Sequence, residues 1–104
     1  MNRLVVLATD FHAIHEHGSV QHGRRFVLRA ASQPSDAVVL RAQLRLIRAE
    51  LDDHVITAML PGVGQDVCGL AAWAFERLSG PLPKLEWVSV AEDGEEGYVE
   101  RTVR

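Results

Sequence analysis

The chain has 104 residues, of which 47% are hydrophobic and 24% charged. This balance predicts one packed domain over residues 1–104 and excludes a disordered chain. The formal net charge is −3, which gives no electrostatic footprint for nucleic acid or for an anionic membrane. No stretch approaches the ~20 apolar residues of a membrane span, and the single cysteine, Cys68, excludes an internal disulfide. We therefore expect a cytoplasmic protein with no nucleic acid and no membrane among its partners.

Two strands are predicted at the N-terminus. Leu4 to Ile14 is rich in Val, Leu, Ile and Phe and carries no charged helical face, which favours a largely buried strand. Gly18-Ser19 is typical of a turn centre. Residues Arg24 to Ala31 alternate well enough to form the returning strand of a hairpin.

The middle of the chain predicts two helices. From Asp36, which can cap the first helix as Ser35 can, apolar residues recur at the spacing of one helical face. Asp66 is expected to cap the second helix, and Gly80-Pro81 to end it. The core-facing residues are expected to be Leu40, Leu44, Ile47 and Leu51 in the first helix and Val67, Leu70, Ala71, Ala74 and Leu78 in the second.

Two more strands are predicted at the C-terminus, over Leu85 to Glu92 and Tyr98 to Val103, with either Asp93-Gly94 or Glu96-Gly97 as the turn. The order ββααββ predicts an α+β fold, in which a four-stranded antiparallel sheet carries both helices on one face. Such an open sheet has two bare edges. Because proteins seldom leave apolar edges unpaired, we expect assembly through them.

Three short motifs resemble those of one enzyme family. Phe11-His12-Ala13-Ile14-His15 is similar to Phe-x-Ala-x-His, and His22-Gly23-Arg24-Arg25-Phe26 to His-Gly-His-Asn-Tyr. Val88-Ser89-Val90-Ala91-Glu92 is similar to a strand that ends in a glutamate. With their shared order, these motifs resemble the 6-pyruvoyltetrahydropterin synthase family, which includes the 6-carboxytetrahydropterin synthases. The resemblance implies a tunnelling fold (T-fold) and a homo-oligomer, commonly a hexamer of two trimers with inter-subunit sites.

The resemblance also implies a zinc site. Its motifs carry His15 and His22 over as ligands, while Arg24 replaces the family's third histidine. A hairpin that turns at Gly18-Ser19 places His15 directly across from His22, and strand alternation puts His17 on the same face as a candidate third ligand. Arginine cannot coordinate zinc and repels it at close range. Zinc binding and ordinary surface histidines therefore both remain open.

Two further groups are implied for catalysis. Leu51-Asp52-Asp53-His54 resembles a Leu-Asp-His segment of the family, which implies that Asp53 and His54 form a proton-transferring pair. A register in which Asp52 takes the position of the family's aspartate is also open. A third interpretation is that these residues only form a charged helix end. The family's catalytic cysteine is absent, since Gly18 and Ser19 stand in its place. A serine hydroxyl is a poor proton shuttle at neutral pH.

Glu92 is the implied substrate-binding residue. A carboxylate accepts two parallel hydrogen bonds from the amino group and ring N–H of a pterin or guanine. We therefore expect a synthase-like lyase that acts on 7,8-dihydroneopterin triphosphate or a related reduced pterin, with zinc as its cofactor. The alternative is a diverged homologue that binds a pterin or purine without synthase activity, and a purely structural oligomer is a third reading.

Overall fold

The N-terminal hairpin is the longest part of the sheet. Strands β1 (Val5–His17) and β2 (Val20–Ser32) pair along their whole length around the Gly18-Ser19 turn, where Gly18 has φ +63°. Glycine adopts this left-handed conformation without steric cost, which makes the tight turn possible. The computed structural model describes residues 3–62, 66–92 and 94–101.

The remaining elements follow the predicted order. A 3₁₀ turn (Pro34–Asp36) leads into α1 (Ala37–Leu51), which is followed by the short α2 (Ile56–Met59), by α3 (Val67–Ser79) and by strands β3 (Trp87–Glu92) and β4 (Glu95–Glu100). The four strands form one antiparallel sheet in the order β1-β2-β3-β4. The predicted α+β fold is confirmed. Within the described ranges, no helix is long and apolar enough to cross a membrane.

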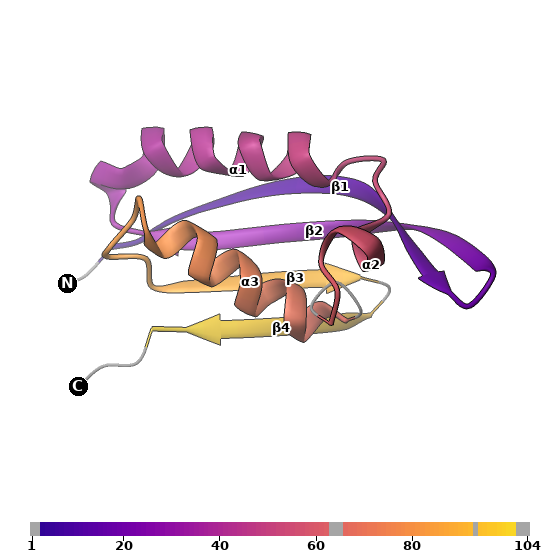
Figure 1. The fold of residues 1–104 in the computed structure, drawn as a ribbon. Helices are drawn as coiled ribbons and strands as arrows, with labels where there is room; N and C mark the ends of the chain where they lie inside the picture. Colours follow the sequence, from indigo (N-terminus) through magenta and orange to yellow (C-terminus); the bar gives the residue numbers. More distant parts are fainter. Residues whose placement is uncertain (1–2, 63–65, 93, 102–104) are drawn as a thin grey trace.

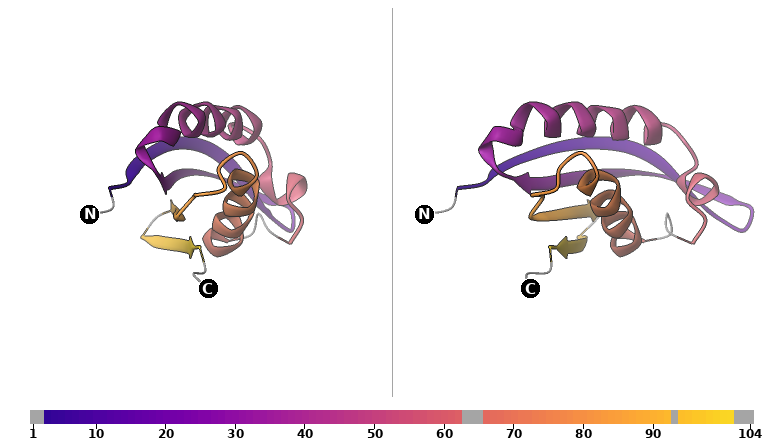
Figure 2. Two further views of the ribbon diagram at one scale, coloured as in Figure 1. Left: turned by 90° about the vertical axis from the view of Figure 1, so that its left-hand side faces the viewer. Right: turned by 60° about the vertical axis from the view of Figure 1, so that its left-hand side comes forward.

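Both long helices lie on one face of the twisted sheet (Figures 1 and 2). Helix α1 packs mainly on β1, and α3 packs on β3 and β4. Their predicted apolar stripes are buried against Phe11, Phe26, Leu28, Val88 and Val90. The hairpin tip extends beyond the two long helices, next to α2 (Figure 1). The helix-side face of the hairpin tip is therefore not covered by α1 or α3.

The helix starts were predicted with mixed success. Asp66 caps α3 as expected, because its carboxylate accepts a hydrogen bond from the Gly69 N–H at 2.7 Å. Asp36 stands at the N-cap of α1 but makes no capping hydrogen bond. Its carboxylate instead accepts from the Ser32 hydroxyl at 2.6 Å, which ties the start of the helix to the end of β2.

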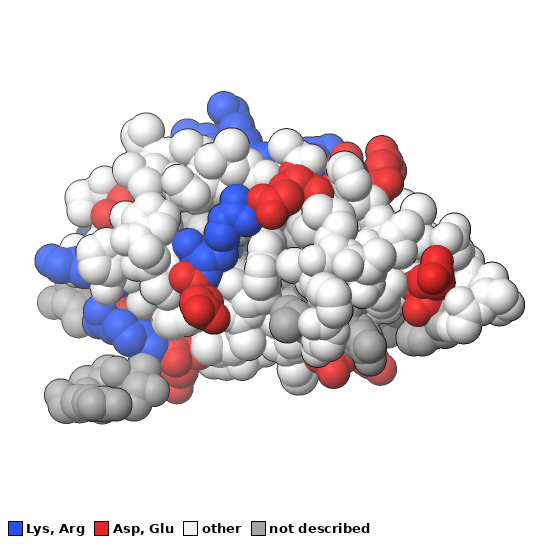
Figure 3. Space-filling view, viewed as in Figure 1, with Lys and Arg blue, Asp and Glu red and all other residues white. Residues whose placement is uncertain are grey.

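The helix-side surface mixes charges of both signs (Figure 3). An ion pair of 2.6 Å between Arg77 on α3 and Glu50 on α1 joins the two long helices. The Arg77 guanidinium also lies 5.6 Å from the centre of the Trp73 ring. The ion pair thus joins α1 and α3 over the apolar core, whereas the contact with Trp73 lies within α3.

The last strand begins earlier than the sequence predicted. Strand β4 starts at Glu95, so Glu96-Gly97 lies within a strand, and that alternative for the turn was wrong. The chain reverses between Glu92 and Glu95, where Gly94 has φ +84°; Asp93 and the end of the predicted strand, residues 102–103, lie outside the described residues. Gly97 pairs with Val90 on the helix side, where a Cβ atom would overlap the Val67 carbonyl. This glycine serves close packing.

Gly97 should therefore be intolerant of a side chain. We expect Gly97→Ala to lower the free energy of unfolding by about 1–3 kcal/mol, because α3 must move away from β4 to admit the methyl group. Gly80→Ala is the control, since Gly80 has helical φ and ψ and space for a Cβ. Urea unfolding at equal protein concentration measures both variants. A Gly97→Ala protein as stable as wild type would contradict the packing argument.

Candidate functional site

The helix-side face of the hairpin gathers three of the residues singled out by the sequence. His15 pairs with His22 across the two strands, as predicted, and Arg24 pairs with Ala13 one step nearer the core. Paired residues and alternate residues share a face of a sheet. His15, His22 and Arg24 therefore belong to one face, which is continuous with the buried core at Phe26.

Burial separates the two imidazoles. His15 is only 6% exposed, and its ring stacks on Phe26 with the centroids 5.4 Å apart. Phe26 in turn stacks on Phe11 at 5.2 Å. His22 lies opposite on the exposed part of β2. The aromatic stack thus holds His15 in place, while His22 faces solvent.

The predicted zinc ligands are only partly described. The backbone of His17 pairs with Val20 at the end of the hairpin, but its side chain lies outside the described residues. In the described part of the chain, no group of three or more His, Cys, Asp and Glu side chains is arranged to hold a metal ion. A guanidinium also follows His22 on the same face. The described groups, two imidazoles beside Arg24, do not fit a zinc site on their own.

Glu92 joins this face from β3. It follows Val88 and Val90 at every second position, so its side chain lies on the helix side of the sheet. Its Oε1 forms an ion pair with Arg24 Nε at 3.3 Å. The Glu92 side chain is 15% exposed and that of Arg24 is 42% exposed. The guanidinium at the position of the family's third zinc ligand is therefore engaged with the predicted ligand-binding carboxylate.

A pocket of about 340 Å³ lies at the end of the sheet, where Glu92 borders it. Most of it lies on the face opposite the helices, because Val27 alternates with the buried Phe26 and Leu28, and Ala91 with Val90. Val27 and Ala91 pair across β2 and β3 and form its apolar floor. This volume lies in the range of small-molecule sites. The described residues that line it are Arg25, Val27, Ala91, Glu92, Gly94, Glu95 and Glu96.

The segment after α1 carries the predicted catalytic pair but holds it in a structural arrangement. Asp52 Oδ1 accepts from the His12 N–H at 2.8 Å, and the Asp53 N–H donates to the His12 carbonyl at 2.5 Å. His54 Nδ1 lies 2.7 Å from the Asp52 carbonyl oxygen. Asp53 has φ +59°, an uncommon conformation outside glycine. The side chains of Asp53 and His54 are both exposed. Among the described residues, no hydrogen bond or ion pair joins either of them to Glu92.

The same segment protects half of the edge of β1. The Ile14 N–H donates to the His54 carbonyl at 2.9 Å, and the Glu16 N–H donates to Thr57 Oγ1 at 3.1 Å. Together with the contacts of His12, these bonds cover the outer edge of β1 towards the hairpin tip. The edge near Val5 makes no such bond within the described ranges.

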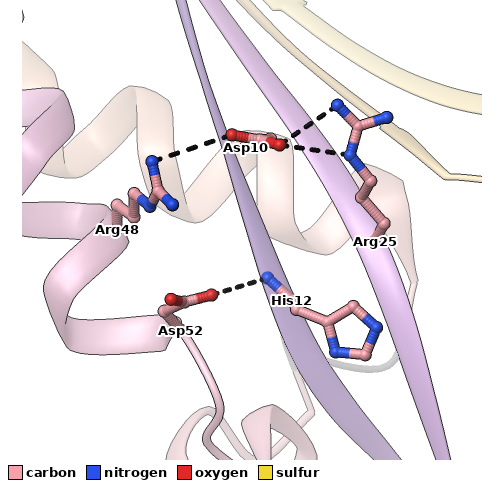
Figure 4. A network of polar contacts seen from close by, with 5 residues as sticks. All are labelled: Asp10, His12, Arg25, Arg48 and Asp52. Carbon is pink, nitrogen blue, oxygen red and sulfur yellow. Dashed lines mark hydrogen bonds and ion pairs between the residues drawn. The ribbon is translucent and has the colours of Figure 1, made fainter.

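Asp10 is a polar centre that the sequence reasoning missed (Figure 4). Its Oδ2 accepts from both Nε and Nη2 of Arg25 at 3.1 Å, and its Oδ1 lies 3.8 Å from Arg48 Nη1 of α1. The hydrogen bond from Arg25 is the largest cause that lowers the pKa of Asp10, and the charges of Arg25 and Arg48 add to it. A charged residue between Thr9 and Phe11 in an apolar strand was the available signal.

The chain matches no model of a known protein family and no curated protein sequence. The relation to the pterin synthases therefore stays a resemblance of short motifs, and the geometry of the face formed by His15, His22, Arg24 and Glu92 carries the functional argument.

The Asp10 network makes a prediction about pH. A folded-state pKa below the unfolded value, about 3.9, stabilises the protein above that value, and the stabilisation is lost as pH falls through the folded pKa. We expect Arg25→Met to raise the Asp10 pKa, measured by NMR titration of the carboxyl carbon, because the main hydrogen bond is lost. Arg41→Met, on the exposed side of α1, is the control. An unchanged Asp10 pKa in Arg25→Met would refute the assignment.

Proposed function

We propose that this chain is a diverged tunnelling-fold protein of the 6-pyruvoyltetrahydropterin synthase type that binds a pterin or purine ring through Glu92 and lacks synthase activity. The observation that carries this proposal is the half-buried Glu92 carboxylate at the end of β3, held by Arg24 on the helix side of the sheet. The ββααββ order and the antiparallel sheet support it. The absence of a disulfide-forming cysteine pair favours a cytoplasmic setting.

The chemistry of Glu92 suits a fused bicyclic base. An ionised carboxylate only accepts hydrogen bonds, and its two oxygens match the amino group and neighbouring ring N–H of a pterin or guanine. A low exposed fraction shields these bonds from competing water.

Three features favour binding over catalysis. Gly18 and Ser19 occupy the exposed turn where the family has its cysteine, so that proton shuttle is missing. Arg24 places a permanent positive charge beside His22, which disfavours zinc. The carbonyl of Asp52 contacts the His54 ring, so this imidazole already has a structural partner within the chain.

We also propose that copies of the chain assemble through their sheet edges into the ring-shaped homo-oligomer implied by the resemblance. The two edges carry complementary charge. Strand β4 exposes Glu95, Glu96 and Glu100, whereas arginines of α1 border β1 at Leu7, Ala8 and Thr9. The three arginines are Arg41, Arg45 and Arg48. Together with Leu7, Ala8, Thr9 and Leu44 they line a shallow pocket at this edge. Because β1 and β4 are antiparallel, the sheet can continue from one copy to the next.

The proposal predicts that pterin binding depends on Glu92. We expect Glu92→Gln to weaken binding of pterin by about tenfold or more, because the amide offers one acceptor and no charge. Isothermal titration calorimetry on the assembled protein measures the affinity. Glu76→Gln, which removes an exposed carboxylate from α3, is the matched control. Equal affinity in wild type and Glu92→Gln would end the proposal.

The second candidate is synthase activity, which the cross-strand pairing of His15 with His22 favours. Our proposal predicts that purified protein supplied with zinc leaves 7,8-dihydroneopterin triphosphate unchanged in an assay for released triphosphate. The double variant His15→Ala/His22→Ala is the control. Triphosphate release that disappears in the double variant would instead establish the synthase reaction.

A further inference from the structure

The ion pair between Arg24 and Glu92 points to more than a carboxylate anchor. Arg24 Nε contacts Glu92 Oε1 at 3.3 Å, so a planar cation lies beside one end of the carboxylate. The two residues come from neighbouring strands, β2 and β3, and lie on the same face of the sheet. Together they present hydrogen-bond acceptors next to positively charged donors.

We propose that Arg24 is a specificity-determining residue of the Glu92 site, and that the pair selects rings in which an amino group, a ring N–H and an oxo group follow one another along one edge. This inference rests on the proposed function. Glu92 accepts from the amino group and the ring N–H, and the guanidinium of Arg24 donates to the oxo group. The chemical class selected is the 2-amino-oxo pyrimidine edge shared by pterin and guanine.

The geometry also gives the orientation of the ring. Because Arg24 lies at the Oε1 end of the carboxylate, the oxo group is directed to that end and the amino group to Oε2. A ring without the oxo group leaves Arg24 without its ligand contact. A ring that carries a hydrogen-bond donor in that place meets a like partner, since guanidinium has no acceptor.

Calorimetry with pterin, guanine and the neutral form of 2-aminobenzimidazole tests this inference, because 2-aminobenzimidazole keeps the amino group and a neighbouring ring N–H but lacks the oxo group. We expect Arg24→Met to weaken binding of pterin and guanine by about tenfold or more and to leave that of 2-aminobenzimidazole within about twofold. Arg29→Met is the matched control, since Arg29 lies on β2 but on the opposite face of the sheet. Arg24→Gln gives a second variant of the same kind if Arg24→Met does not fold.

The outcomes separate the two proposals. Pterin binding that is lost in Glu92→Gln but unchanged in Arg24→Met would overturn the role of Arg24 and leave the proposed function standing. An equal loss for all three compounds in Arg24→Met would also overturn it, because Arg24 would then only orient Glu92. If none of the three compounds binds to wild type, the proposed function fails and this inference fails with it.

Discussion

The register of the β1–β2 hairpin decides what the rest of the molecule can do. The two-residue turn at Gly18 pairs His15 with His22 and Phe11 with Phe26. Side chains alternate between the faces of a strand, so a slip of one residue would move each of these groups to the other face. The same register buries Phe11 and Phe26 under the helices. It also places Arg24 on the helix side of the sheet, where the Glu92 side chain lies.

The segment after α1 couples this hairpin to the helix layer. Backbone bonds to His12 and Ile14 run along the outer edge of β1, and the Asp52 carboxylate takes part in them. Asp10 adds a charged link, since it contacts Arg25 of the sheet and Arg48 of α1. The residues that the family resemblance assigns to catalysis therefore lie in a segment that also supports the fold. Substitutions there must be interpreted with stability measured alongside.

Arg24 has two consequences that reinforce each other. Its charge opposes a metal ion beside His22, and its contact with Glu92 changes what that carboxylate presents to a ligand. The half-buried position of Glu92 strengthens its hydrogen bonds, because competing water is partly excluded.

The sequence by itself determined the elements and the core. Hydrophobic periodicity, the Gly18-Ser19 turn and the Asp66 cap are local features, and they predicted the strands, both helix stripes and the pairing of His15 with His22. The start of β4 could not be predicted from the sequence. Glu96-Gly97 has the residue types of a turn, whereas the close contact of Gly97 with Val67 depends on how α3 packs on the sheet.

Only the tertiary structure decided the partners of the polar groups. Glu92 was predicted to bind a ring, but its ion pair with Arg24 joins residues from distant parts of the chain. The contacts of Asp10 with Arg48 and of Asp52 with His12 are equally non-local. A sequence pattern shows on which face a charged side chain lies. Which opposite charge it contacts depends on how the strands and helices pack against one another. Local periodicity does not encode the distance between two charged groups that are far apart in the sequence.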